Sequence, residues 1–184
     1  IDANVGAHTC DITMDDGTVT TLDTYTITIT QVNDEPTLSA TGVTADFTED
    51  GSNLALFSSA AAADSDATVT QTYLSIVITI TNIADTSEYL VIDGSDCLLG
   101  TAATCVADTA TNAGAAVVTV SVATSTVTWT ADAGGISEAA METLINALAY
   151  KNTDQSPTDV ADRVATITTL QDSGGATGDN DDSV

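Results

Sequence analysis

The sequence predicts an all-β protein, a sandwich of antiparallel sheets with one short helix, and two observations carry this prediction. First, apolar and polar residues alternate along many short segments, as in strands that bury one face. Second, turn signals separate these segments: DDG at 15–17, EDG at 49–51, DGSD at 93–96, NAG at 112–114 and AGG at 133–135. Many short strands at such spacing are typical of a β-sandwich.

The expected strands are rich in β-branched residues, which favour half-buried antiparallel sheets. In TYTITIT at 24–30, every second residue is apolar, so Tyr25, Ile27 and Ile29 share one face. The same alternation runs through TYLSIVITITNI at 72–83, VVTVSV at 117–122 and STVTWT at 125–130. Each segment therefore predicts a strand with one face in the core.

One segment departs from alternation. In ISEAAMETLINALAY at 136–150, apolar residues recur every four positions, which is helical spacing. Glu138 would lie in the first turn, where a negative charge suits the helix dipole. We expect a single helix at 137–147.

The charge balance restricts the partners. Twenty-seven acidic residues face only two basic ones, Lys151 and Arg163, for a formal charge of −25. Such a surface repels nucleic acid and anionic membranes, and no direct membrane insertion is expected. Only five of the acids are Glu. The dominance of Asp, a short ligand suited to turns, favours divalent-cation binding over general surface acidity.

Three cysteines occur, at positions 10, 97 and 105. In CLLGTAATC the two later cysteines flank a Gly-containing loop that can close a hairpin, which favours a disulfide between Cys97 and Cys105 over free thiols. An extracellular setting agrees with such a bond. Cys10 is then the odd thiol, and we expect it to be buried in a strand.

An internal repeat divides the chain. HTCDITMDDGTVTTLDTYTITIT at 8–30 and VATITTLQDSGGATGDNDDSV at 164–184 both join a Thr-rich strand to an Asp-Gly turn, with an offset of 156 residues. We therefore expect residues 1–32 to be the last two strands of a preceding repeat, or a donor-strand segment. Residues 33–36 would form a linker, and residues 37–184 a repeat that lacks its final strand.

Four motifs carry a resemblance to a known family. VNDEP at 32–36, FTEDG at 47–51, ADSDA at 63–67 and QDSGG at 171–175 resemble the cadherin-like, VNDxP-type tandem repeats of large bacterial surface adhesins. The resemblance implies a seven-stranded Greek-key β-sandwich of the cadherin or immunoglobulin type, with calcium at the junctions between repeats. Carried over by motif, the implied calcium ligands are Asn33, Asp34, Asp64, Asp66, Asp172, Glu49 and Asp16.

The chemistry of these residues agrees with the resemblance. Calcium prefers about 6–8 oxygen ligands from carboxylates, amides and backbone carbonyls. Asp64 and Asp66 are two residues apart, so an extended loop would project both to one side. Pro36 fixes its own φ and lacks an N–H, which restricts the linker. Asp15 can replace Asp16 as the ligand, and for Glu35 a solvated charge is favoured over an extra ligand.

The function that follows is a structural, non-catalytic extracellular calcium-binding repeat that forms a stiff rod in a surface adhesin or fibre. Its partners would be neighbouring copies of the same repeat. The alternative is a filament subunit that polymerises head to tail by β-strand donation. A carbohydrate-binding or glycoside-hydrolysing sandwich is less favoured, because aromatic residues are few. Catalytic motifs such as HExxH are absent, and His8 is the only histidine.

Overall fold

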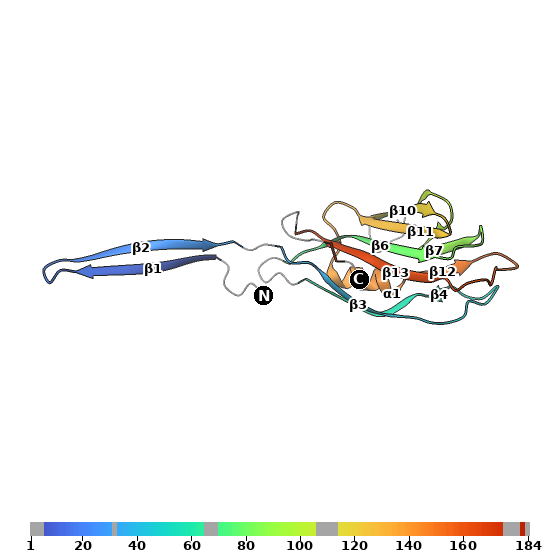
Figure 1. Ribbon diagram of the computed structural model, residues 1–184, viewed down its shortest axis with the longest axis horizontal. Coiled ribbons are helices and arrows are strands. Elements are labelled where there is room, and N and C mark those ends of the chain that lie inside the picture. The colour runs from blue at the N-terminus through green and yellow to red at the C-terminus, as the bar shows by residue number, and fades with distance from the viewer. Residues whose placement is uncertain (1–5, 31–32, 65–69, 106–113, 175–180, 183–184) are drawn as a thin grey trace.

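The computed structural model describes residues 6–30, 33–64, 70–105, 114–174 and 181–182. The fold is all-β and sandwich-like with one helix, as predicted, and a long hairpin extends away from the sandwich (Figure 1). The resemblance implies seven strands for one repeat, whereas the described residues from 37 onward form twelve strands, β3 to β14, in three sheets. Several of these strands are very short, such as the two-residue β4 (Leu54–Ala55), the three-residue β9 (Ala103–Cys105) and the two-residue β14 (Asp181–Asp182).

The larger sheet forms one layer of the sandwich. Its order is β14-β13-β6-β11-β10-β9, and its strands are antiparallel. They comprise Asp181–Asp182 (β14), Val164–Asp172 (β13), Tyr73–Thr81 (β6), Thr124–Ala131 (β11), Gly114–Ser121 (β10) and Ala103–Cys105 (β9). The alternation predicted for 72–83 is confirmed in β6, where Ile76, Ile78 and Ile80 are buried.

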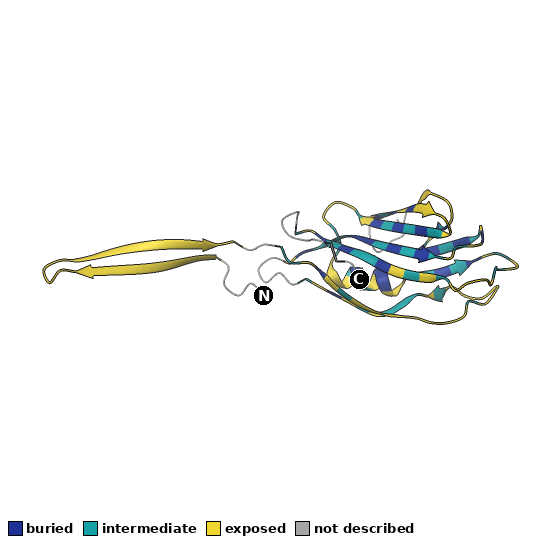
Figure 2. Ribbon diagram, viewed as in Figure 1, coloured by how far each residue is buried: buried dark blue, intermediate teal, exposed yellow. Residues whose placement is uncertain are grey.

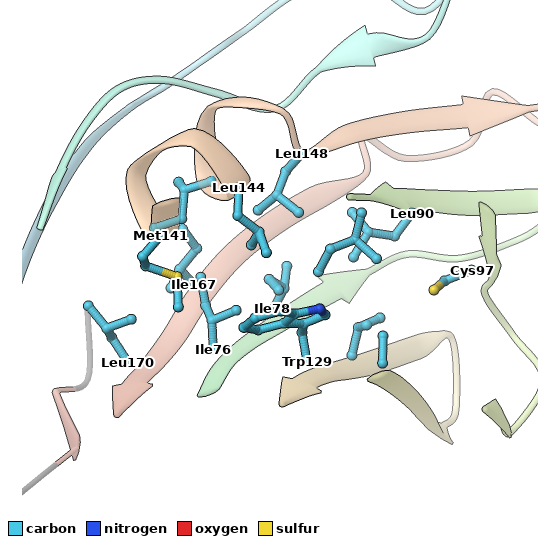
Figure 3. Close-up of a cluster of buried hydrophobic side chains, with 14 of the residues drawn as sticks. Ile76, Ile78, Leu90, Cys97, Trp129, Met141, Leu144, Leu148, Ile167 and Leu170 are labelled. Carbon is cyan, nitrogen blue, oxygen red and sulfur yellow. The ribbon is translucent and has the colours of Figure 1, made fainter. Parts of the chain in front are cut away.

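The second layer combines two small sheets and the helix. One sheet has the order β4-β12-β7-β8, and the other pairs β3 with β5. The remaining bounds are Thr37–Gly42 (β3), Phe57–Ala63 (β5), Glu88–Ile92 (β7), Ser95–Leu98 (β8), Glu138–Asn146 (α1) and Ala149–Asn152 (β12). Figure 3 shows the core between the layers, where Met141 and Leu144 of α1 point toward Ile76 and Ile167 of the larger sheet.

The predicted helix is confirmed. Ser137 is its N-cap, and the Ser137 Oγ accepts a hydrogen bond from the Ala140 N–H at 3.3 Å. The helix also completes the edge of β5, because Asn146 Oδ1 accepts from the Ala60 N–H at 3.0 Å and Glu142 Oε1 accepts from the Ala62 N–H at 3.1 Å. The described part of the chain holds no helix long and apolar enough to cross a membrane.

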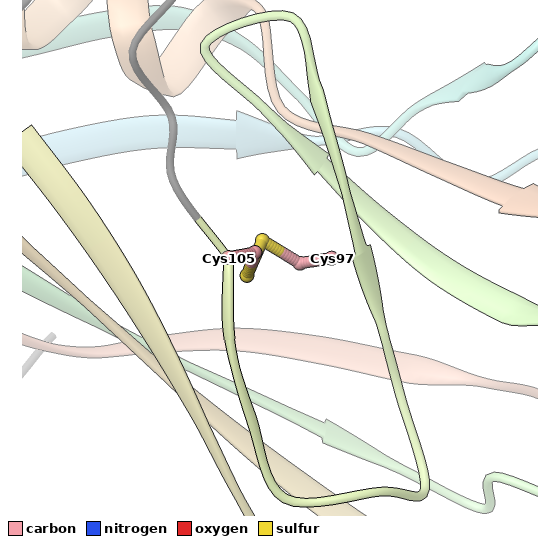
Figure 4. Close-up of a disulfide and its surroundings, with 2 residues drawn as sticks. All are labelled: Cys97 and Cys105. Atoms are coloured by element: carbon pink, nitrogen blue, oxygen red, sulfur yellow. A yellow bond between two sulfur atoms is a disulfide. The ribbon is translucent and has the colours of Figure 1, made fainter.

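The predicted disulfide is also confirmed, and it joins the two layers (Figure 4). Cys97 lies in β8, the edge strand of the four-stranded sheet, and Cys105 lies in β9, the edge strand of the larger sheet. Their Cα atoms are 5.5 Å apart. The bond therefore closes one side of the sandwich covalently.

The hairpin consists of β1 (Gly6–Asp15) and β2 (Thr20–Ile29), and every residue of both strands is exposed (Figure 2). The register opposes Cys10 to Tyr25 and His8 to Ile27, so one face carries the apolar side chains and the other is rich in threonine. The expectation that Cys10 is buried is wrong, since neither face of the hairpin is buried in the described structure.

Candidate functional site at the linker

Gln71 joins three segments of the chain where the linker meets the sandwich. Its backbone N–H donates to Asp64 Oδ2 at 3.0 Å, and its side-chain Nε2 donates to Asn33 Oδ1 in a short hydrogen bond. The Ser173 hydroxyl in turn donates to Gln71 Oε1 at 3.2 Å. We call Asn33, Asp64, Gln71, Asp172, Ser173 and Gly174 the junction cluster. It connects the linker, the end of β5 and the end of β13.

Gly174 allows the linker to approach the sandwich closely. A Cβ atom at this position would lie 1.4 Å from Asn33 Oδ1 and 2.5 Å from Gln71 Nε2. The Gly174 N–H also donates to Asp172 Oδ1 at 2.9 Å, which fixes the turn after β13. Any side chain at position 174 would therefore displace Asn33, and with it the linker.

Negative charge is concentrated beside the cluster. Asp172 is fully buried at the end of β13, although its type is rarely buried without compensation. The pKa of the neighbouring Tyr73 hydroxyl is raised, first by its burial and then by the charges of Glu138, Asp64, Asp172 and Glu142. The carboxylates of three separate elements thus act on one buried hydroxyl.

The structure brings together some of the expected ligands and separates others. Asn33, Asp64 and Asp172 meet in the junction cluster, and Asp34 is half-buried in the linker beside it. Asp66 lies outside the described residues. Glu49 is exposed in the loop after β3, a strand that runs away from the linker.

Asp16 lies in the turn of the hairpin, where its carboxylate is already engaged. Its Oδ1 accepts from the Val19 N–H at 2.8 Å and from the Thr18 N–H at 2.9 Å, and these bonds lower the pKa of Asp16. Asp15, the alternative ligand, accepts from the Gly17 N–H at 2.7 Å. Both residues therefore have a role as turn formers.

The donors of the junction cluster fit calcium in kind. They are carboxylate and amide oxygens, which this ion prefers. The carboxylates in the described residues are not sufficient, however, because no group of three or more His, Cys, Asp or Glu side chains among them could hold a metal.

A second polar cluster lies at the other end of β6, and the sequence did not predict it. Glu88 is fully buried, and its Oε1 accepts from Arg163 Nη2 at 2.8 Å, from the Asp85 N–H at 2.7 Å and from the Ala84 N–H at 2.9 Å. Arg163 Nη2 also lies 3.4 Å from Asp85 Oδ2. The one available signal was that Arg163 is one of only two basic residues.

The ionisation of this cluster is set by its internal bonds. Burial by itself would raise the pKa of Glu88, but the hydrogen bonds from Arg163, Asp85 and Ala84 outweigh burial and lower it. The pKa of Asp85 is likewise lowered by Thr158, Asn152 and Arg163 against the effect of its burial. Each group is bonded to the others, so the cluster holds together the loop after β6 and the loop before β13.

Comparisons of the chain with protein-family models, with curated proteins and with solved structures found no match. The function proposed below is based on the contacts of the junction cluster.

Proposed function

We propose that the chain is a structural, non-catalytic extracellular repeat of the cadherin-like type, which binds calcium where the linker meets the sandwich. The observation that carries this proposal is that Gln71 bonds to Asn33, to Asp64 and to Ser173, the neighbour of Asp172, although these residues come from three separate segments. The Cys97–Cys105 disulfide is compatible with an extracellular protein.

Asn33 and Asp34 would hold the ion from the linker, and Asp64, Asp66 and Asp172 would hold it from the sandwich. A bound calcium ion would supply a shared positive charge for these oxygens. Because the ligands belong to the linker and to the sandwich, binding would fix the direction in which the linker leaves the sandwich. A chain of such units would form a stiff rod.

The strand pairing supports the repeat. In the hairpin, Met14 pairs with Thr21 and Asp15 with Thr20. In the larger sheet, Leu170 pairs with position 182 and Gln171 with position 181. The offset of 156 residues matches Met14 with Leu170 and Asp15 with Gln171. The two hairpins thus start their pairing at equivalent residues of the first strand, whereas the partner positions 181 and 182 correspond by the same offset to Tyr25 and Thr26, because the loop before β14 is longer.

Calcium is expected to stabilise the protein. At a calcium concentration about 100-fold above the Kd, binding to the folded state adds about 2.7 kcal/mol, which raises Tm by about 5–10 °C for a chain of this size. Differential scanning calorimetry with calcium and with EDTA measures the effect. If EDTA left both Tm and the rigidity of the linker unchanged, the calcium proposal would fail.

Two substitutions distinguish calcium binding at the junction cluster from calcium binding by acidic residues elsewhere on the surface. Asp64→Asn removes a charge from the junction cluster and is expected to weaken calcium binding by about tenfold or more in isothermal titration calorimetry. Asp154→Asn is the matched control, since Asp154 accepts from the Ser156 N–H at 2.9 Å in the loop after β12. Equal losses of affinity would place the calcium elsewhere on the surface.

The alternative function, a filament subunit that donates a strand, has one observation in its favour. β13 has nine residues, but within the described chain only Leu170 and Gln171 pair on its outer side, with β14. β2 has ten residues and exposes Tyr25, Ile27 and Ile29 in one row. An unpaired strand edge is a template for strand addition, and β2 is a candidate donor.

Deleting residues 1–32 is expected to abolish fibres if β2 is donated between molecules, because the donor is then absent. Ile27→Thr should slow assembly, since it removes an apolar side chain and keeps a β-branched one. Leu22→Thr is the control, because Leu22 and Ile27 are both 61% exposed and lie on opposite faces of the hairpin. Fibres of the deletion variant in electron micrographs would rule out strand donation.

A further inference from the structure

We propose that Gln71 is a positioning residue of the junction cluster: its side chain fastens the linker to the sandwich, and calcium must displace its amide to bind Asn33. Only the competition between Gln71 and calcium rests on the proposed calcium function. The fastening of the linker to the sandwich concerns hydrogen bonds within the chain alone.

Gln71 is placed to contact both the linker and the sandwich. It is 8% exposed, at the start of the segment that leads into β6. Its amide nitrogen donates to Asn33 of the linker, and its amide oxygen accepts from Ser173 after β13. Ser173 Oγ also accepts from the Thr72 N–H at 3.0 Å. The side chain of Gln71 therefore bridges the linker and the last turn of the larger sheet.

The Asn33 carboxamide is enclosed by these neighbours. On one side stands Gly174, where even a Cβ atom would overlap Asn33 Oδ1, and on another stands Gln71 Nε2. The Asn33 Nδ2 atom is buried and has no hydrogen-bond partner among the described residues. A cation that approached Asn33 Oδ1 would meet the positive end of the Gln71 amide dipole. Gln71 and calcium therefore compete for the same oxygen.

The competition has a specific consequence for substitutions. Replacing the Gln71 side chain leaves its backbone N–H, so the bond to Asp64 is retained. Only the bonds to Asn33 and Ser173 are lost. A residue that merely stabilised the cluster would weaken calcium binding when removed. A residue that competes with the ion would strengthen it.

The test uses Gln71→Met, which keeps the length of the side chain and removes its hydrogen bonds. In EDTA, the distance distribution between spin labels on Cys10 and on Val122→Cys should broaden, because the linker is no longer fastened. Val122 is 96% exposed, and Cys10 is exposed in β1. With calcium, the affinity should rise about fivefold, since one competing hydrogen bond is worth about that factor.

Gln155→Met is the matched control, because Gln155 Nε2 donates to Asp50 Oδ1 at 3.2 Å away from the linker. It should change neither the label distances nor the calcium affinity. An unchanged distance distribution for Gln71→Met in EDTA would overturn the positioning role, and an unchanged or weaker affinity would overturn the competition. If the wild-type chain bound no calcium at all, the proposed function and the competition would both fail. The EDTA measurement would still decide the positioning role.

Discussion

Replacing Arg163 with methionine is expected to lower the free energy of unfolding by about 3–5 kcal/mol, because it leaves buried carboxylates without their charged partner. Glu88 is fully buried, and the side chain of Arg163 is only 14% exposed. The guanidinium also donates to the carbonyl oxygens of Thr158 and Ala161, at 3.0 and 2.9 Å. The loop before β13 thus loses both its ion pair and its backbone anchor. Urea unfolding followed by circular dichroism measures the change.

The chain offers a matched control in its other basic residue. Lys151 pairs with Asp96, but the two side chains are 31% and 42% exposed. An exposed ion pair contributes at most about 1 kcal/mol, so Lys151→Met should change the free energy of unfolding by no more than that. Similar losses in the two variants would contradict a special role for the buried cluster.

The acid side of the stability curve gives a second readout for Arg163. Because the pKa of Glu88 is lowered in the folded protein, Glu88 contributes stability that is present above its unfolded pKa of about 4.3 and is lost as pH falls through the folded pKa. In Arg163→Met, Glu88 keeps its hydrogen bonds from the Asp85 and Ala84 N–H groups but loses its charged partner, so its pKa is higher than in the wild type. Acid unfolding of the variant should therefore begin at a higher pH than that of the wild type.

Trp129→Ala is expected to destabilise the protein by about 3–5 kcal/mol, because it removes the largest side chain of the core. Trp129 is fully buried in β11, between the two layers (Figure 3). The closeness of the packing is evident at Gly114, where a Cβ atom would lie 2.5 Å from Trp129 Cζ2. Because Trp129 is the only tryptophan, the variant has no tryptophan fluorescence, and its unfolding should be followed by circular dichroism.

Trp129→Phe distinguishes the volume of the side chain from its polarity. The indole Nε1 is buried and has no hydrogen-bond partner in the described structure. Phenylalanine removes this polar atom and keeps most of the aromatic surface, so its cost should be clearly smaller than that of alanine. Equal costs would show that the cavity is not the main cause of the loss.

Much of the fold could be predicted because its signals are local. The helix at 137–147 differs from the observed Glu138–Asn146 only by its caps, and the eight-residue separation of Cys97 and Cys105 made their pairing evident. Alternation correctly placed Tyr25, Ile27 and Ile29 on one face of β2. It did not predict their exposure, because alternation specifies which side chains share a face and not what covers that face.

The parts that escaped prediction depend on contacts distant in sequence. Arg163 and Glu88 are 75 residues apart, and neither stands in a motif. Gln71 escaped for a related reason. The motifs identified carboxylates and Asn33 as ligand types, whereas a glutamine that donates to those oxygens is an ordinary polar residue in the sequence. Its hydrogen-bond partners Asn33 and Ser173 are 38 and 102 residues away in the sequence, so no local pattern links them to Gln71.

The pairing of Lys151 with Asp96 and of Arg163 with Glu88 also has a consequence for how these molecules crowd together. Both cations are paired within the chain, and a formal charge of −25 remains to set the external field. Neighbouring molecules should therefore repel one another over a screening distance of about 8 Å at physiological salt and over a longer distance at lower ionic strength. Lateral spacing in a dense layer would then follow the salinity of the medium.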